Sequence, residues 1–149
     1  MIAIANRQRA GARARKIDLR LLEKIAAAAL EELGMEAAEL GIVLVSAKEM
    51  ASLNEKFLGH EGPTDVITFD YQNTELRICG EIFVCVEEAK RQAKEFKTTW
   101  QSEAIRYVVH GILHLAGHDD LNPIARKKMK KEEGRLVREL SRRFALSKL

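Results

Sequence analysis

The stretch VVHGILHLAGHDD, residues 108–120, places three histidines and two aspartates in an otherwise apolar segment. Its apolar residues have the spacing of a buried helix, and Gly117 is placed to end that helix. The sequence therefore predicts a helix over about residues 99–116 that carries metal-seeking side chains. The remaining elements have to be arranged around this one.

Strand-like and helix-like segments alternate along the rest of the chain, with no repeat and no low-complexity linker. Asp18, Ser46 and Asn122 are placed as helix N-caps, and Pro123 stands in the first turn after Asn122. The predicted strands cover residues 2–6, 40–45, 64–69 and 80–86. The other predicted helices cover residues 18–33, 46–58 and 87–97 and a last stretch from 123 onward. We expect an α+β (mixed α/β) fold in a single domain over residues 1–149, with a small mixed sheet of four to five strands and about five helices.

His110 and His114 are four residues apart, so on a helix their side chains lie on one face, about 5–6 Å apart at Cβ. Two imidazoles at this separation can reach one ion at about 2.0–2.1 Å each. A third ligand can come from beyond Gly117, where Asp120 and His118 are the candidates. The alternative is that the histidines are ordinary helix-face residues, hydrogen-bonded to backbone or to each other. The whole grouping falls within residues 110–120, which favours metal binding.

The residue after the first histidine limits the chemistry of this site. Zinc proteases with the H-E-x-x-H motif use the glutamate after the first histidine as general base, but here that position is Gly111. A peptidase is therefore disfavoured. Three protein ligands and a water in an open position would still form a hydrolytic site, since a metal ion lowers the pKa of its bound water.

Composition indicates a soluble globular domain. The chain has 149 residues, of which 46% are hydrophobic and 32% charged. Its apolar runs are shorter than the roughly 18 residues needed to cross a bilayer. Cys79 and Cys85 form no C-x-x-C pair, and we expect free thiols in a reducing cytoplasm.

Positive charge is concentrated at the two ends of the chain. Residues 1–20 contain six Lys and Arg against one Asp, and residues 121–149 contain ten against three Glu. These ends can simply be solvated faces. The functional alternative is that they converge in space as a patch that attracts phosphate groups.

Three ordered segments resemble one known family. HGILHLAGHDD is similar to the H-G-x-L-H-L-x-G-[YH]-D-H signature of the YbeY endoribonucleases, which are metal-dependent enzymes of ribosomal RNA maturation. LNEKFLGHEGPTDVITF, residues 53–69, resembles the L-N-x-x-[YF]-R-x-x-x-x-P-T-D-V-L-S-F segment of that family. CGEIFVC, residues 79–85, is similar to its L-G-D-I-x-I-[SC] strand. The resemblance covers roughly residues 40–120.

The resemblance implies a zincin-like fold and a single-strand-specific endoribonuclease that matures the 3′ end of small-subunit ribosomal RNA and serves ribosome quality control. It implies that His110, His114 and Asp120 hold one metal ion, Zn²⁺ or another divalent metal, and act through the bound water. Its implied partners are ribosomal RNA and the small ribosomal subunit, with no DNA and no membrane.

Two positions depart from the family pattern. Asp120 stands where the family has its third histidine ligand, and a carboxylate oxygen can bind zinc at about 2.0–2.2 Å. His118 is the second choice for that ligand. Leu58 stands where the family has an arginine suited to a substrate phosphate, and Lys56 or a basic residue from either end could substitute for it. We expect Thr64 and Asp65 to form a turn rather than part of the catalytic machinery.

Two other functions remain open from the sequence. A ribosome-associated RNA-binding factor with a structural metal site would need a fourth protein ligand, because structural zinc sites are normally closed. A metallopeptidase would need a carboxylate base from a distant residue such as Asp65.

Overall fold

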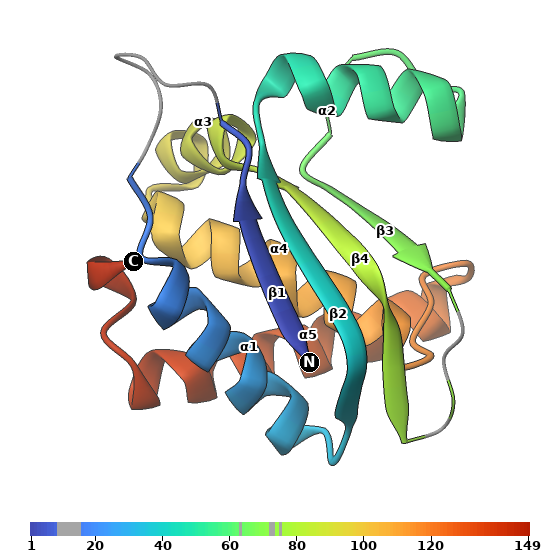
Figure 1. Cartoon of the computed structure of the whole chain (residues 1–149), viewed down its shortest axis with the longest axis vertical. Helices are drawn as coiled ribbons and strands as arrows, with labels where there is room; N and C mark the ends of the chain where they lie inside the picture. The colour runs from blue at the N-terminus through green and yellow to red at the C-terminus, as the bar shows by residue number, and fades with distance from the viewer. Residues whose placement is uncertain (9–15, 63, 72–73, 75) are drawn as a thin grey trace.

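The structure is a computed structural model that describes residues 1–8, 16–62, 64–71, 74 and 76–149. Figure 1 shows four strands in one sheet with helices packed around them. The strands are β1 (Ile2–Asn6), β2 (Glu36–Val45), β3 (Val66–Asp70) and β4 (Arg77–Cys85). The helices are α1 (Leu19–Glu32), α2 (Ala47–Leu53), α3 (Val86–Phe96), α4 (Trp100–Leu115) and α5 (Pro123–Arg143), with a π-helical turn η1 (Asn54–Leu58) and a 3-10 turn η2 (Leu146–Lys148).

The sheet is mixed, as predicted. Its strand order is β1-β2-β4-β3. Strands β1, β2 and β4 run parallel, and β3 is antiparallel to β4 at the edge. Ile42 at the centre of β2 lies between Ile4 of β1 and Ile82 of β4, and Ile82 in turn pairs with Thr68 of β3.

The two faces of the sheet bury different side chains because successive residues of a strand point to opposite sides. Leu40, Ile42 and Leu44 of β2 belong to the main core, which α1 and α4 cover. Val43 and Val45 of the same strand belong to a smaller core under α2. In Figure 1, α1, α4 and α5 lie behind the sheet, and α2 lies across its upper end.

The predicted helix caps are confirmed. Asp18 accepts a hydrogen bond from the Leu21 amide, Ser46 from the Glu49 amide, and Asn122 from the Ala125 amide. These side chains satisfy amide groups that have no partner within the first turn of a helix. The helix predicted over residues 99–116 is α4, which Thr99 caps through the Ser102 amide.

Two features of the fold differ in detail from the prediction. β2 and β4 begin earlier than expected. Their parallel pairing starts at the polar residues Glu36 and Arg77, where the apolar pattern gives no sign of a strand. The helix after Ser46 does end near Leu58, but its last turn is the π-helical η1, which Gly59 ends in a left-handed conformation with φ +67°. None of the helices in the described ranges has the length and apolar character of a membrane span.

Candidate metal centre

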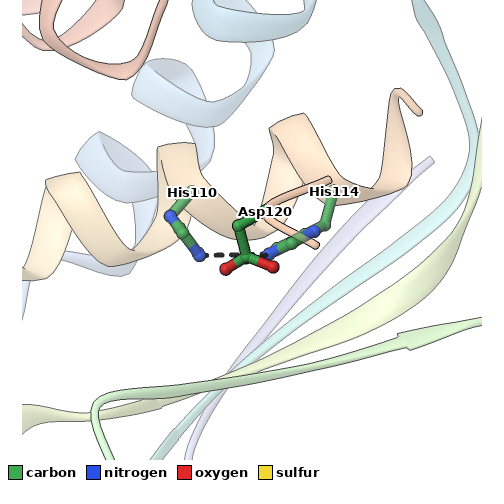
Figure 2. A group of neighbouring side chains, drawn as sticks. All are labelled: His110, His114 and Asp120. Carbon is green, nitrogen blue, oxygen red and sulfur yellow. Dashed lines mark hydrogen bonds and ion pairs between the residues drawn. The ribbon is translucent and has the colours of Figure 1, made fainter. Parts of the chain in front are cut away.

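His110 and His114 lie on one face of α4 and point toward each other. Their Nε2 atoms are 3.1 Å apart, and both side chains are half-buried. Figure 2 shows both rings leaving the helix on the same side. The opposite side of α4 is buried in the main core, so the helix holds the two imidazoles at the wall of a cleft.

The loop after α4 brings Asp120 back to the histidines. Gly117 has φ +99°, a conformation that favours glycine, and the His118 amide donates to the Leu113 carbonyl at 2.9 Å. This turn reverses the chain, and Asp120 Oδ2 comes within 4.0 Å of His114 Nε2. One ligand atom from each of His110, His114 and Asp120 lies within 4.8 Å of the others. Figure 2 shows the carboxylate facing the two rings.

Each imidazole is oriented by a hydrogen bond at its other nitrogen. His110 Nδ1 lies 2.9 Å from Oε2 of Glu133 on α5, and His114 Nδ1 lies 3.1 Å from the His118 carbonyl oxygen. A carbonyl can only accept, so His114 Nδ1 donates, and its Nε2 keeps a free lone pair. His110 follows the same pattern: when its Nδ1 donates to the Glu133 carboxylate, its Nε2 also keeps a free lone pair. This is the arrangement that second-sphere partners impose on metal-binding histidines.

The two imidazoles differ in their affinity for protons. Burial opposes protonation of His110, but the hydrogen bond to Glu133 and the negative charge of that carboxylate outweigh it, so the pKa of His110 is raised. Burial and the neighbouring His110 lower the pKa of His114. Burial raises the pKa of Glu133, but His110 and Arg106 outweigh it, and the pKa of Glu133 is lowered overall. The carboxylate of Glu133 is therefore ionised at neutral pH.

The cluster of His110, His114 and Asp120 could bind a metal ion. Two ligand atoms that each lie about 2.0–2.2 Å from one ion are separated by up to about 4.4 Å, and the two Nε2 atoms meet this condition as they stand. The Asp120 side chain is 47% exposed, so it has room to approach. Two imidazoles and a carboxylate suit zinc and also other divalent ions.

A cleft of about 360 Å³ opens beside the histidines. Its other walls come from η1, β3 and the end of α4: Leu58, Val66, Ile67, Thr68, Asp70 and Leu115. A second hollow of about 240 Å³ lies on the other side of His110 and shares His110 and Val66 with the cleft. The ligand cluster thus lies beside a groove between α4 and β3 that a substrate can enter.

Gly111 occupies the base position of a zinc protease, and the structure explains why it is glycine. A Cβ at Gly111 would come within 2.7 Å of the side chain of Ile82 on β4. That position faces the sheet, where α4 and β4 are in contact, and it leaves no space for a glutamate side chain. The general base of an H-E-x-x-H peptidase is therefore excluded on steric grounds as well as by sequence.

The other candidate residues have structural partners. His118 contributes its carbonyl to His114, and its side chain is not part of the ligand cluster. Asp65 accepts hydrogen bonds from the Val66 amide at 2.8 Å and the Thr64 hydroxyl at 3.3 Å, which agrees with the expected turn. Leu58 is 49% exposed and lines the cleft, so the position that departs from the family pattern does face the site.

Glu133 and Arg106 were not predicted as site residues. Glu133 occupies a buried position on α5 between Met129 and Leu136, and the only sign in the sequence is a glutamate at an apolar position of an amphipathic helix. Arg106 lies one turn before His110 on α4, and its Nη1 lies 3.2 Å from Glu133 Oε1. Because both contacts join different helices, periodicity along one helix does not reveal them.

The convergence of the two basic ends, one of the two alternatives that the sequence left open, stays untested. Arg7 forms an ion pair with Glu49 of α2. Residues 9–15, which carry much of the positive charge near the N-terminus, lie outside the described residues.

Comparison with known proteins identifies the family. The family described as "Endoribonuclease YbeY" matches residues 3–141. The chain belongs to the YbeY endoribonuclease family. It is 35% identical over 119 residues to Endoribonuclease YbeY of Chlorobium phaeovibrioides, a match that covers 80% of each chain. It is 39% identical over 114 residues to Endoribonuclease YbeY of Elusimicrobium minutum, covering 74% of this chain and 80% of that one.

A solved structure agrees with this YbeY assignment. The solution structure of TM1509 from Thermotoga maritima matches with a TM-score of 0.67 and 31% identity, over 94% of this chain and 89% of that one. The α+β fold expected from the sequence is thus confirmed by the arrangement of helices and strands and by a structural relative.

Proposed function

We propose that this chain is a metal-dependent endoribonuclease in which His110, His114 and Asp120 hold one divalent ion, Zn²⁺ in the first instance. The observation that carries the proposal is the grouping of three ligand atoms within 4.8 Å beside an open cleft. Membership of the YbeY family supports an RNA-cleaving hydrolase.

When bound, the ion supplies Lewis-acid chemistry: it lowers the pKa of a water molecule and offsets negative charge on a phosphodiester. The residues of the chain prepare the site for this. Glu133 and the His118 carbonyl hold the two imidazoles with Nε2 directed into the cluster. Thr68 and Leu58 line the cleft next to the cluster, and a phosphodiester can approach the cluster through this cleft.

The finer assignment is to ribosomal RNA. We propose that the substrate is single-stranded RNA at the 3′ end of small-subunit ribosomal RNA, that the enzyme acts on the small ribosomal subunit in maturation and quality control, and that it works in the cytoplasm. The resemblance of residues 53–69, 79–85 and 110–120 to YbeY motifs supports this assignment. The basic C-terminal stretch is compatible with a polyanionic substrate.

A purely structural metal site is the main alternative, and the geometry disfavours it. Structural zinc sites are normally closed by four protein ligands. In the part of the chain that the structure describes, the cluster has three, and it borders a cleft.

The experiment compares RNA cleavage by the wild type, His114→Ala and His60→Ala, with and without a chelator. His60 is an exposed loop histidine outside the cluster, so its substitution is a matched control. The substrate is a single-stranded RNA with the sequence of the 3′ end of small-subunit ribosomal RNA, beside a duplex of the same strand. We expect zinc-restored cleavage of the single strand by the wild type and His60→Ala, and none by His114→Ala. Cleavage by His114→Ala in chelator at the wild-type rate would refute the proposal.

A further inference from the structure

The cleft and the second hollow, which share His110, differ in whether Lys or Arg side chains line them. The cleft next to Leu58, Thr68 and Asp70 has neither residue among its lining residues. The second hollow at His110 is lined by Arg106 of α4 and Lys130 of α5, together with the carboxylates of Asp65, Glu103 and Glu133. Every nucleotide of RNA carries a negative charge, and cationic side chains supply most of the affinity of nonspecific nucleic-acid binding. Of the two hollows, only the one beside α5 offers cationic side chains that the backbone of a bound strand can contact.

Arg126 and Lys130 form a row along α5. They are four residues apart, which places them on one face of the helix, with about 6 Å of rise between them. Arg126 Nη2 donates to the Asp120 carbonyl at 3.3 Å, and Lys130 lines the hollow together with His110. One end of the row therefore lies at Asp120 and the other at His110.

The charges of this row are available to an external anion. Both side chains are exposed. The hydrogen bond of Arg126 goes to a neutral carbonyl, and among the described residues no ion pair joins Lys130 or Arg126 to a carboxylate. By contrast, Arg106 is held by Glu133.

The carboxylates of the hollow already have partners within the protein. Glu133 is held by His110 and Arg106, Glu103 accepts from the Thr98 hydroxyl at 2.8 Å, and Asp65 accepts from the Val66 amide. Of the three, Glu133 has a cationic partner in Arg106, and among the described residues none of the three forms an ion pair with Lys130.

A polar group in the same hollow also lacks a partner. The Tyr107 side chain lines the hollow and is 4% exposed, and its hydroxyl makes no hydrogen bond to any residue that the structure describes. Buried hydroxyl groups are normally satisfied, so this one indicates that the hollow receives water or a polar ligand.

We propose that Arg126 and Lys130 bind backbone phosphates of single-stranded RNA on either side of the phosphodiester that is cut. The inference rests on the proposed function for its substrate class and adds where the strand is held. Two positive charges one helical turn apart on the exposed face of α5 suit the regularly repeated phosphates of an RNA strand.

The test measures RNA binding by fluorescence anisotropy in chelator, where the strand stays intact. The double variant that carries Arg126→Gln and Lys130→Gln is compared with a control double variant that carries Lys127→Gln and Lys131→Gln. The control pair removes the same charge from the next row of the same helix, and both of its residues are exposed. Lys130→Gln alone is included because it leaves the contact of Arg126 with the Asp120 carbonyl in place. Thermal unfolding checks that all variants are folded.

The expected result is an at least about tenfold weaker affinity for the Arg126 and Lys130 pair, and a smaller change for the control pair. The slope of log affinity against log salt should fall by about 1.4 for the pair and about 0.7 for Lys130→Gln alone, because each phosphate contact on a single strand contributes about 0.7. Equal losses of RNA affinity in the two double variants would overturn the proposed role of Arg126 and Lys130. Cleavage by the zinc-loaded protein separates the two proposals. If binding depends on Arg126 and Lys130 but the wild type cleaves no RNA, the proposed function alone is refuted. If the wild type cleaves RNA but both pairs of variants bind equally well, the role of Arg126 and Lys130 alone is refuted.

Discussion

At the scale of single residues, Glu133 links α5 to the candidate metal ligands. Its carboxylate contacts His110 and Arg106, and it is 9% exposed. A buried carboxylate with two cationic or hydrogen-bonding partners is stable only while both remain in place. Glu133 therefore fixes the ring of His110 and the docking of α5 at the same time.

Replacing Glu133 should weaken metal binding without removing a ligand. We expect Glu133→Gln to lower zinc affinity about tenfold and Glu133→Ala up to about a hundredfold, since outer-sphere partners of metal-bound histidines have effects of this size. A competition titration with a chelating dye measures the affinity.

Glu132→Gln is the matched control for this substitution. Glu132 is paired with Arg135 on the surface of α5 and is absent from the ligand cluster. Equal zinc affinities for the Glu133 and Glu132 variants would show that the contact with His110 does not orient a ligand.

The thiol of Cys85 should be unreactive in the native protein. Burial raises the pKa of the Cys85 thiol to about 11, so it stays protonated at pH 8. The thiolate is the reactive form, and Cys85 is also buried. We expect iodoacetamide at pH 8 to leave Cys85 unmodified in the native protein and to modify it after denaturation, as read by peptide mass spectrometry. Rapid labelling of native Cys85 would contradict the packing of β4.

The sequence could predict part of the site because that part is local. The four-residue spacing of His110 and His114 on one helix is enough to place both rings together. The choice between Asp120 and His118 depends on how the chain turns at Gly117, which residue spacing leaves open. The structure turns the Asp120 carboxylate toward the histidines and uses the His118 carbonyl as a hydrogen-bond acceptor, and Asp120 as third ligand stays a prediction.

At the scale of elements, the close contact of α4 with β4 positions the site. Gly111 faces Ile82. A Cβ at Gly80 of β4 would collide first with the backbone oxygen of Phe69 on β3 and would also come within 2.8 Å of the Leu115 side chain of α4. Glycine on each element lets the helix approach the sheet closely. This approach sets the depth at which His110 and His114 enter the groove.

Alanine at Gly111 should destabilise the protein although alanine favours helices. The new Cβ would overlap the fully buried Ile82 side chain, at a cost of about 1–3 kcal/mol, while helix propensity returns up to about 1 kcal/mol. We expect Gly111→Ala to lower the free energy of unfolding by about 1–2 kcal/mol in urea denaturation.

Gly134→Ala provides a control of opposite sign. Its Cβ would approach only the end of the flexible Arg138 side chain on α5. We expect a gain of about 0.5–1 kcal/mol in the free energy of unfolding. A stabilised Gly111→Ala variant would mean that α4 does not contact β4 as closely as described.

The type and order of the elements could be predicted from apolar spacing and capping residues, because both are local signals. Asp18, Ser46 and Asn122 mark helix starts correctly. The π-helical turn of η1 could not be predicted, because its spacing of apolar residues does not distinguish it from an α-helix. Nor does the alternation of helices and strands specify that β4 lies between β2 and β3.

At the scale of the whole molecule, metal binding should be coupled to stability. The candidate ligands come from α4 and from the loop that leads to α5, and Glu133 ties α5 to the same cluster. An ion bound by the folded chain and not by the unfolded chain stabilises the fold. The coupling extends beyond the site because α5 also packs against α1.

We expect zinc at about a hundred times its dissociation constant to stabilise the wild type by about 2.7 kcal/mol. For a chain of this length that corresponds to a rise in Tm of about 5–10 °C in thermal unfolding. The rise should be lost in His114→Ala and kept in His60→Ala. An equal rise in the two variants would place the ion elsewhere.

Anomalous diffraction at the zinc edge from crystals grown with zinc tests the central claim most directly. We expect one strong peak bonded to His110 Nε2, His114 Nε2 and a carboxylate oxygen of Asp120, with an open position toward the cleft. A peak held by His118 in place of Asp120, or no peak between the two histidines, would contradict it.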